Sequence, residues 1–137
     1  MRIINTTPHP IVFVGKCGEE FTVSPCGILI NAKPVEEDAL ERGTKGEIDP
    51  ARKLRPRLRD AIAEEGVQFV RTRFVADPVS DAALSRLEEE DHEALIVGSI
   101  IAAQAFPGRV LGLIAAPGFE RVPVDQKRMR SDKFTIF

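Results

Sequence analysis

The densest group of residues able to do chemistry is basic: five Arg and Lys residues fall within the eight positions from 52 to 59. Arg55, Arg57 and Arg59 stand at the beginning of a segment that reads as a helix from Pro56 to Glu65. The N–H groups at the beginning of a helix attract anions, and added arginines strengthen that attraction. These three arginines are therefore the candidate contact surface for a phosphate, a nucleic acid or an acidic partner. The alternative is a solvated charged face whose arginine stems cover nearby leucines.

His9 is the second candidate, because it stands between two prolines that fix the backbone on either side. A rigid Pro-His-Pro turn can hold an imidazole for proton transfer or for binding. An anionic or nucleotide-like molecule would suit such a site, with Arg71 or Arg73 in the same pocket. The alternative is a turn residue that only hydrogen-bonds the backbone. A site of this kind requires His9 in a concave pocket with other polar groups converging on it, and a His9 on a flat or convex surface would exclude it.

The cysteines and the acidic residues give no metal site. Cys17 and Cys26 bracket one expected strand and are either free thiols or a disulfide worth about 2–3 kcal/mol. Two cysteines without a second pair of ligands do not make a zinc site. The acids from Glu88 to Asp91 point around a helix instead of converging. Because no phosphate-binding glycine motif is present either, we expect no cofactor and no metal.

The elements that must position these residues are short. Apolar periodicity and turn signals predict strands over residues 2–5, 11–14, 20–23, 28–30, 67–75, 94–97, 110–114, 121–124 and 134–137. Helices are predicted over 34–40, 56–65, 80–91 and 100–106, the last two with Ser80 and Ser99 as N-caps. Residues 40–49 lack a clear period and are predicted to be a mobile loop, and 127–133 a basic loop.

These elements predict a single α+β domain over residues 1–137, with an N-terminal β-meander, a mostly antiparallel or mixed sheet and two to three short helices. Residues 94–114 read as a compact β-α-β unit. The segment 33–66 holds 17 charged residues and reads as a charged insertion that carries the helix near 56–65.

Composition narrows the class of partner. The chain has 137 residues, 43% of them hydrophobic, and this excludes an intrinsically disordered protein. Its net charge of -2 hides a segregation of charge, because 67–93 is acidic and 94–137 is basic. The chain has no Trp or Tyr for base stacking, so nucleic acid is less favoured than a protein partner. No apolar run reaches the roughly 18 residues of a membrane span, so we expect an intracellular protein and no membrane contact.

The segment Asn5-Thr6-Thr7-Pro8-His9-Pro10-Ile11-Val12 reads as a strand and a tight turn. It resembles the opening of a family of small uncharacterised proteins from phages and prokaryotes, which share an Asn-x-Thr-Pro-His strand and turn. The resemblance continues through Pro25-Cys26-Gly27, Val70-Arg71-Thr72-Arg73-Phe74, the apolar stretch from Ile96 to Ala103, and Pro107-Gly108-Arg109. It implies that the turn is a shared element, and it implies no activity. Few Asn and Gln residues suggest a heat-adapted source, such as a virus of a heat-loving archaeon.

We therefore expect a non-enzymatic binding protein of viral or mobile-element origin, in the host cytoplasm if viral. Its partner would be another protein or a second copy of the chain, contacted through Arg55, Arg57 and Arg59. The alternative hypothesis is a small enzyme or ligand-binding protein that acts on an anionic molecule at His9.

Overall fold

The computed structural model describes residues 2–39 and 54–137. Within these ranges it contains both helices and sheets, which confirms the predicted α+β class. The chain divides into two compact units, Met1–Lys33 with Phe74–Phe137, and Pro34–Arg73. The predicted charged insertion falls in the second unit apart from Lys33, and that unit extends to Arg73. The loop predicted over 40–49, and Arg52 and Lys53, lie outside the described residues.

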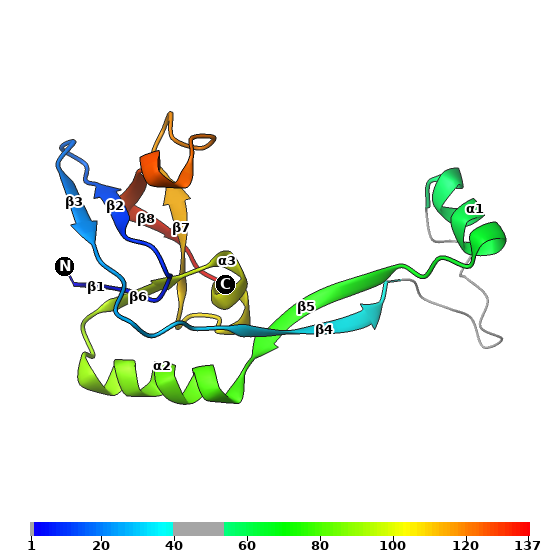
Figure 1. The fold of residues 1–137 in the computed structure, drawn as a ribbon, viewed down its shortest axis with the longest axis horizontal. Coiled ribbons are helices and arrows are strands. Elements are labelled where there is room, and N and C mark those ends of the chain that lie inside the picture. The colour runs from blue at the N-terminus through cyan, green and yellow to red at the C-terminus, as the bar shows by residue number, and fades with distance from the viewer. Residues whose placement is uncertain (1, 40–53) are drawn as a thin grey trace. The chain divides into compact units, whose positions relative to one another are not determined.

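The first unit is built around a six-stranded mixed sheet (Figure 1). In sheet order the strands are β1 (Ile3–Asn5), β6 (Leu95–Gly98), β7 (Leu111–Ala115), β8 (Met129–Thr135), β2 (Ile11–Val14) and β3 (Glu20–Val23). The pairs β1/β6, β6/β7 and β2/β8 are parallel, whereas β7/β8 and β2/β3 are antiparallel. The two edges of the sheet meet just after β3, where Asn5 bridges Pro25 and the Cys26 N–H donates to the Asn5 carbonyl at 2.9 Å.

The predicted β-α-β unit is confirmed in the first unit. β6 and β7 are parallel neighbours, and α3 (Ile100–Ala105) connects them. The Ser99 hydroxyl accepts a hydrogen bond of 3.1 Å from the Ala102 N–H, so Ser99 is the predicted N-cap. Gly108 adopts φ 74° in the turn that returns the chain to β7, a conformation that favours glycine.

The longest of the described helices, α2 (Pro78–Glu90), begins three residues earlier than the predicted N-cap Ser80 implies. Its N-cap is Asp77, whose carboxylate accepts from the Val79 N–H at 3.4 Å, and the proline occupies the first helical position. The prediction of Ser80 as the N-cap is wrong, because Ser80 lies buried inside the first turn of the helix. Its hydroxyl instead accepts a hydrogen bond of 2.8 Å from the Asn31 N–H.

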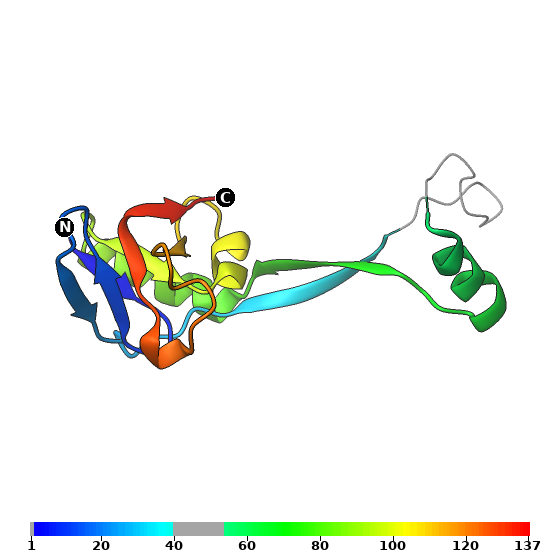
Figure 2. The same ribbon diagram turned by 90° about the horizontal axis from the view of Figure 1, so that it is seen from above.

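Two apolar clusters hold the first unit together. One cluster packs α2 and α3 against β6 through Leu84, Leu87, Ile96, Ala103 and Phe106. Both helices lie beside β6 in the views from the front and from above (Figures 1 and 2). The other cluster is centred on fully buried Phe13 and Val97 and is completed by apolar side chains of β1, β3, β7 and β8. Burial of these side chains supplies the main stabilising free energy of the unit.

The second unit contains most of a two-stranded sheet and the helix α1 (Pro56–Glu65), at the bounds predicted for it. Its strands β4 (Ala32–Asp38) and β5 (Val70–Ala76) run in opposite directions (Figure 1). The helix predicted over 34–40 is wrong, because residues up to Asp38 belong to β4, which pairs with β5. The Ala39 N–H donates to the Phe69 carbonyl at 3.0 Å just beyond the paired strands.

Four further predictions near the sheet are corrected. β1 does not join a meander with β2 and β3, because it pairs in parallel with β6. Residues 28–30 form no strand. Ile30 lies in an irregular segment and is buried in the apolar cluster that packs α2 and α3 against β6. Residues 121–124 form no strand either, and lead into the 3-10 turn η1 (Val124–Gln126). The predicted basic loop 127–133 mostly forms β8, because β2 and β7 both pair with it.

Candidate functional site

The turn between β1 and β2 is organised by the fully buried side chain of Asn5. Its amide nitrogen donates to the carbonyl of His9 at 2.8 Å and to the carbonyl of Val23 at 3.1 Å. Its amide oxygen accepts from the N–H of Thr7 at 2.9 Å and from the Thr7 hydroxyl at 2.6 Å. All four hydrogen-bonding positions of the amide are therefore filled, as burial of a polar side chain demands.

Thr6 fastens the same turn to the centre of the sheet. Its N–H and its hydroxyl both donate to the Val97 carbonyl, at 3.0 Å and 2.8 Å. Gly98 is needed next to this contact, because a Cβ there would lie 2.9 Å from the Thr6 hydroxyl and 2.9 Å from a Val110 methyl. The turn is thus stabilised by the hydrogen bonds of Thr6 to β6 and by those of the buried Asn5 side chain.

The structure separates the two parts of His9. Its backbone carbonyl is structural, because it accepts from the Asn5 amide and, at 3.0 Å, from the Thr7 hydroxyl. Any amino acid supplies that carbonyl. The imidazole is exposed, and within the described ranges no hydrogen bond or ion pair involves it. The hydrogen bonding of the turn therefore explains a residue at position 9 but does not explain a histidine.

The imidazole borders a concave surface, which we call the His9 hollow. Its inner part encloses about 150 Å³ and is lined by β2, the strand β7 and the beginning of β8, with mostly apolar side chains. The lining residues are Thr7, His9, Pro10, Ile11, Val12, Leu113, Val124, Lys127 and Met129. His9 therefore borders a concave surface, but within the described residues no polar group forms a hydrogen bond or an ion pair with its imidazole.

The adjoining outer part of the His9 hollow has a volume of about 540 Å³ and is lined mostly by exposed residues. It shares His9, Pro10, Val12, Val124 and Lys127 with the inner part and adds Asp125. The η1 turn supplies Val124 and Asp125 and lies beside β2 in the view from above (Figure 2). Val124 is 68% exposed, so this wall presents an apolar side chain to solvent.

No family model, curated protein or solved structure matches the chain. The family resemblance and the viral origin suggested by the sequence therefore stay predictions. Within residues 2–39 and 54–137, no helix has both the length and the apolar character that crossing a membrane requires. Over the same ranges, no three His, Cys, Asp or Glu side chains are grouped so that they could hold a metal ion.

The three arginines predicted as a contact surface lie in the second unit. Arg55 immediately precedes α1, and the helix beginning has no side-chain cap. Arg57 and Arg59 are two positions apart, which is about 200° around a helix, so they leave it on nearly opposite sides. Arg57 also forms an ion pair of 2.6 Å with Glu65 at the end of the same helix. The helix therefore does not gather the three guanidinium groups on one face.

Arg71 and Arg73 do not line the His9 hollow. Both belong to β5, where alternate residues share a face, and both are exposed. Arg73 forms an ion pair with Glu37 of the neighbouring strand β4. Among the residues that the structure describes, Lys127 and Asp125 are the charged side chains that line the hollow, and a shared pocket of His9 with Arg71 or Arg73 stays a prediction.

Cys17 and Cys26 are both free and exposed, so the bridge that the sequence left open is not present. The four residues of β3 stand between them, an extended length of about 13 Å. A disulfide requires Cα atoms within about 7 Å.

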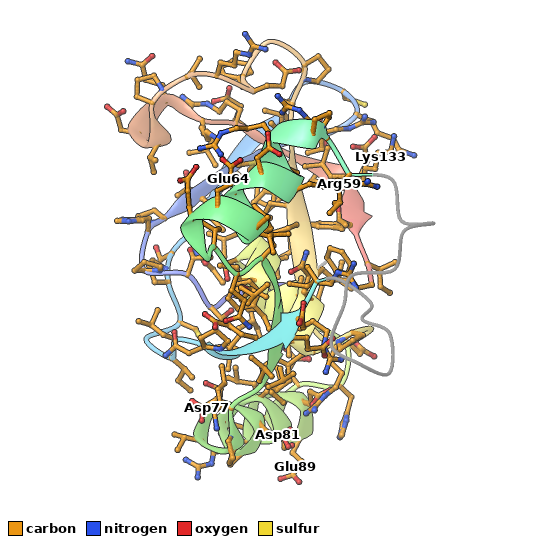
Figure 3. All side chains as sticks on the ribbon, turned by 90° about the vertical axis from the view of Figure 1, so that its right-hand side faces the viewer. Arg59, Glu64, Asp77, Asp81, Glu89 and Lys133 are labelled. Carbon is orange, nitrogen blue, oxygen red and sulfur yellow. The ribbon has the colours of Figure 1, made fainter. Side chains whose placement is uncertain are left out.

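A second hollow, of about 410 Å³, lies where α2 ends and is lined by Glu88, Asp91, His92 and Arg109 among others. Its charged groups already serve the fold. Arg109 donates to Glu88 at 2.6 Å and to Asp81 at 2.8 Å. These hydrogen bonds raise the pKa of its guanidinium, and the bond to Glu88 has the largest effect. Arg2 lies 2.9 Å from Asp91. Asp81, the α2 residue that pairs with Arg109, is labelled in Figure 3.

Sequence reasoning found His9 but missed Val124, Lys127 and Met129. It placed Val124 in a strand and Lys127 in a loop, and neither position carries a local signal that links it to residue 9. The parallel pairing of β2 with β8 brings these segments together, because Phe13 is paired with Met129.

Proposed function

We propose that this protein is a binding protein and that the His9 hollow is its contact surface for a protein partner. The observation that carries the proposal is that the backbone carbonyl and the imidazole of His9 have different environments. The backbone carbonyl is used by the fold, whereas the imidazole is exposed on the rim of an apolar hollow.

The rim of the hollow is preorganised for binding. Pro8 and Pro10 restrict the backbone on both sides of His9, and the buried Asn5 amide fixes the carbonyl between them. A surface that is already ordered loses little conformational entropy when a partner arrives, and this favours affinity. The four filled hydrogen-bonding positions of Asn5 thus support a surface as well as a core.

The wall of the hollow has the composition of a contact site. Apolar side chains of Val12, Leu113 and Met129 lie within it, Val124 lies at the exposed edge, and polar groups stand at the rim. Interfaces concentrate their binding energy in an apolar centre surrounded by polar residues. An aliphatic or aromatic side chain of a partner would fill this centre.

Binding fits the polar groups of the site better than catalysis does. The only hydroxyl that lines the described hollow is that of Thr7, and it donates toward the Asn5 amide oxygen and the His9 carbonyl. A nucleophile activated by His9 would instead need its proton directed at the imidazole.

The proposal is tested by capturing partners from a lysate of the organism that encodes the chain, with the purified protein as bait. Val124→Asp places a charge on the apolar edge, and Val79→Asp is the matched control, because Val79 is also a highly exposed valine, at 77%. We expect Val124→Asp and His9→Ala to lose a partner that the wild type and Val79→Asp retain. Identical capture by all four proteins would overturn the proposal.

A further inference from the structure

We propose that the ligand group recognised by the His9 hollow is an apolar carboxylate: a branched aliphatic group or an aromatic ring with a carboxylate attached. The inference rests on the proposed function and adds the chemistry of the ligand. The source that agrees with the proposed function is the C-terminal residue of a partner protein, and a free small carboxylic acid, which has the same chemistry, is the alternative that the test distinguishes.

The size and lining of the inner hollow set the apolar part of the ligand. It encloses about 150 Å³ between Ile11, Val12, Leu113, Val124 and Met129. A cavity of this volume holds a group about the size of benzene. A leucine side chain or a small ring therefore fits, and a larger ring system would have to extend into the outer hollow.

The charged groups set the polar part. Lys127 lines both parts of the hollow, whereas Asp125 lines only the outer part. The inner part is therefore lined by one cation, Lys127, and by no carboxylate. An anionic group is complementary to that wall, and the imidazole on the same wall can donate a second hydrogen bond to it.

Lys127 differs from Arg128 and Arg130, the basic residues that follow it in the chain, because both of those form ion pairs. Arg128 pairs with Glu20 at 3.3 Å, and Arg130 pairs with Asp132 at 2.9 Å. Over the described ranges, no ion pair involves Lys127.

The test is a titration of the isotope-labelled full chain followed by backbone amide NMR. The probes are 4-methylpentanoate, the neutral 4-methylpentanamide of the same shape, and acetate, which has the charge without the apolar group. We expect 4-methylpentanoate to shift the resonances of Thr7, His9, Val12, Leu113 and Lys127. It should bind at least about tenfold more tightly than either of the other two probes.

Lys127→Met keeps the aliphatic stem and removes the charge, so it should abolish the preference for the carboxylate over the amide. Lys133→Met is the matched control, since Lys133 is an exposed lysine of β8 that does not line the hollow (Figure 3). It should bind all three probes as the wild type does. Amide spectra of the free variants show whether each remains folded.

A second pair of probes separates the two sources. Short peptides that end in leucine are compared as the free acid and as the C-terminal amide. A peptide acid that binds more tightly than 4-methylpentanoate supports a protein C-terminus as the ligand, whereas the reverse order would overturn the C-terminus and point to a free acid.

Equal affinity for carboxylate and amide at the hollow would overturn the carboxylate and leave the hollow as the contact surface. Shifts confined to other residues, or no shifts with any probe, would overturn the inference. The capture experiment with Val124→Asp is independent of these probes. A partner lost there without carboxylate binding here would mean that the proposed function stands and the ligand chemistry is wrong.

Discussion

The side-chain amide of Asn5 donates a hydrogen bond of 2.8 Å to the backbone carbonyl of His9, four residues ahead in the chain. This bond closes the turn between β1 and β2 and leaves the imidazole of His9 at the surface. It is the link between the buried sheet and the proposed contact site, since the same amide also donates to Val23 on β3.

Loss of the Asn5 amide should strongly destabilise the fold. Asn5→Ala removes four hydrogen bonds and leaves buried partners such as the Val23 carbonyl unpaired, so we expect a loss of about 3 kcal/mol in the free energy of unfolding. Urea unfolding measures it. Asn31→Ala is the control, because Asn31 is exposed, and it should change stability by less than about 0.5 kcal/mol. Equal stability of the two variants would contradict the role given to Asn5.

Arg109 should stabilise the first unit in a salt-dependent way. Its guanidinium joins the chain before β7 to Asp81, Ser85 and Glu88 of α2 and lies 5.7 Å from the centre of the Phe106 ring. Because the group is partly exposed, we expect Arg109→Met to lower stability by only about 1 kcal/mol at low salt, and by less in 1 M NaCl. Arg86→Met, at an exposed position of the same helix, should have no comparable effect. A loss that does not change with salt would show that packing alone is responsible.

The Arg130–Asp132 pair on β8 should respond to acid. The hydrogen bonds from Arg130 lower the pKa of the Asp132 carboxyl. A lowered pKa in the folded state means that the pair stabilises the fold above the ordinary aspartate pKa, about 3.9, and that this contribution is lost as the pH falls through the lowered value. Carboxyl NMR titration of Arg130→Gln should show the pKa of Asp132 rising, whereas Lys133→Gln should leave it in place. An unchanged pKa in Arg130→Gln would rule out the hydrogen bonds as the cause.

Both cysteines should react in the native protein. Cys17 and Cys26 are exposed and unbridged, so a thiol reagent should modify two groups per chain without any reductant. The same count should be found after unfolding in urea with reductant. A reaction that begins only after reductant is added would reveal a disulfide and would require β3 to be rearranged.

Elements with local signals could be predicted from the sequence. Pro56 at the first position of α1 and Gly66 just beyond its end fix that helix at its predicted bounds, and Ser99 caps α3 as expected. The antiparallel pair β2 and β3 also follows from alternation and from the turn at Gly15 to Gly18. These signals act within a few residues, so no distant contact is needed to interpret them.

Pairing between distant segments was decided by the tertiary structure. β1 joins β6, with Asn5 opposite Val97, because Thr6 and the surrounding apolar cluster hold the two strands together. No local pattern at Asn5 encodes that choice, since a short apolar strand fits a hairpin equally well. The same limit explains β4, whose charged sequence became a strand once β5 lay beside it.

The candidate site shows the same division. The sequence by itself determined that His9 sits in a rigid turn, because proline fixes the backbone wherever it occurs. Only the tertiary structure decided that the carbonyl of His9 is bound by Asn5, that its imidazole is left over, and that Lys127 and Val124 share its surface. The physical reason is distance along the chain: the contacts that define the hollow join residues more than one hundred positions apart, and packing of the sheet brings them together.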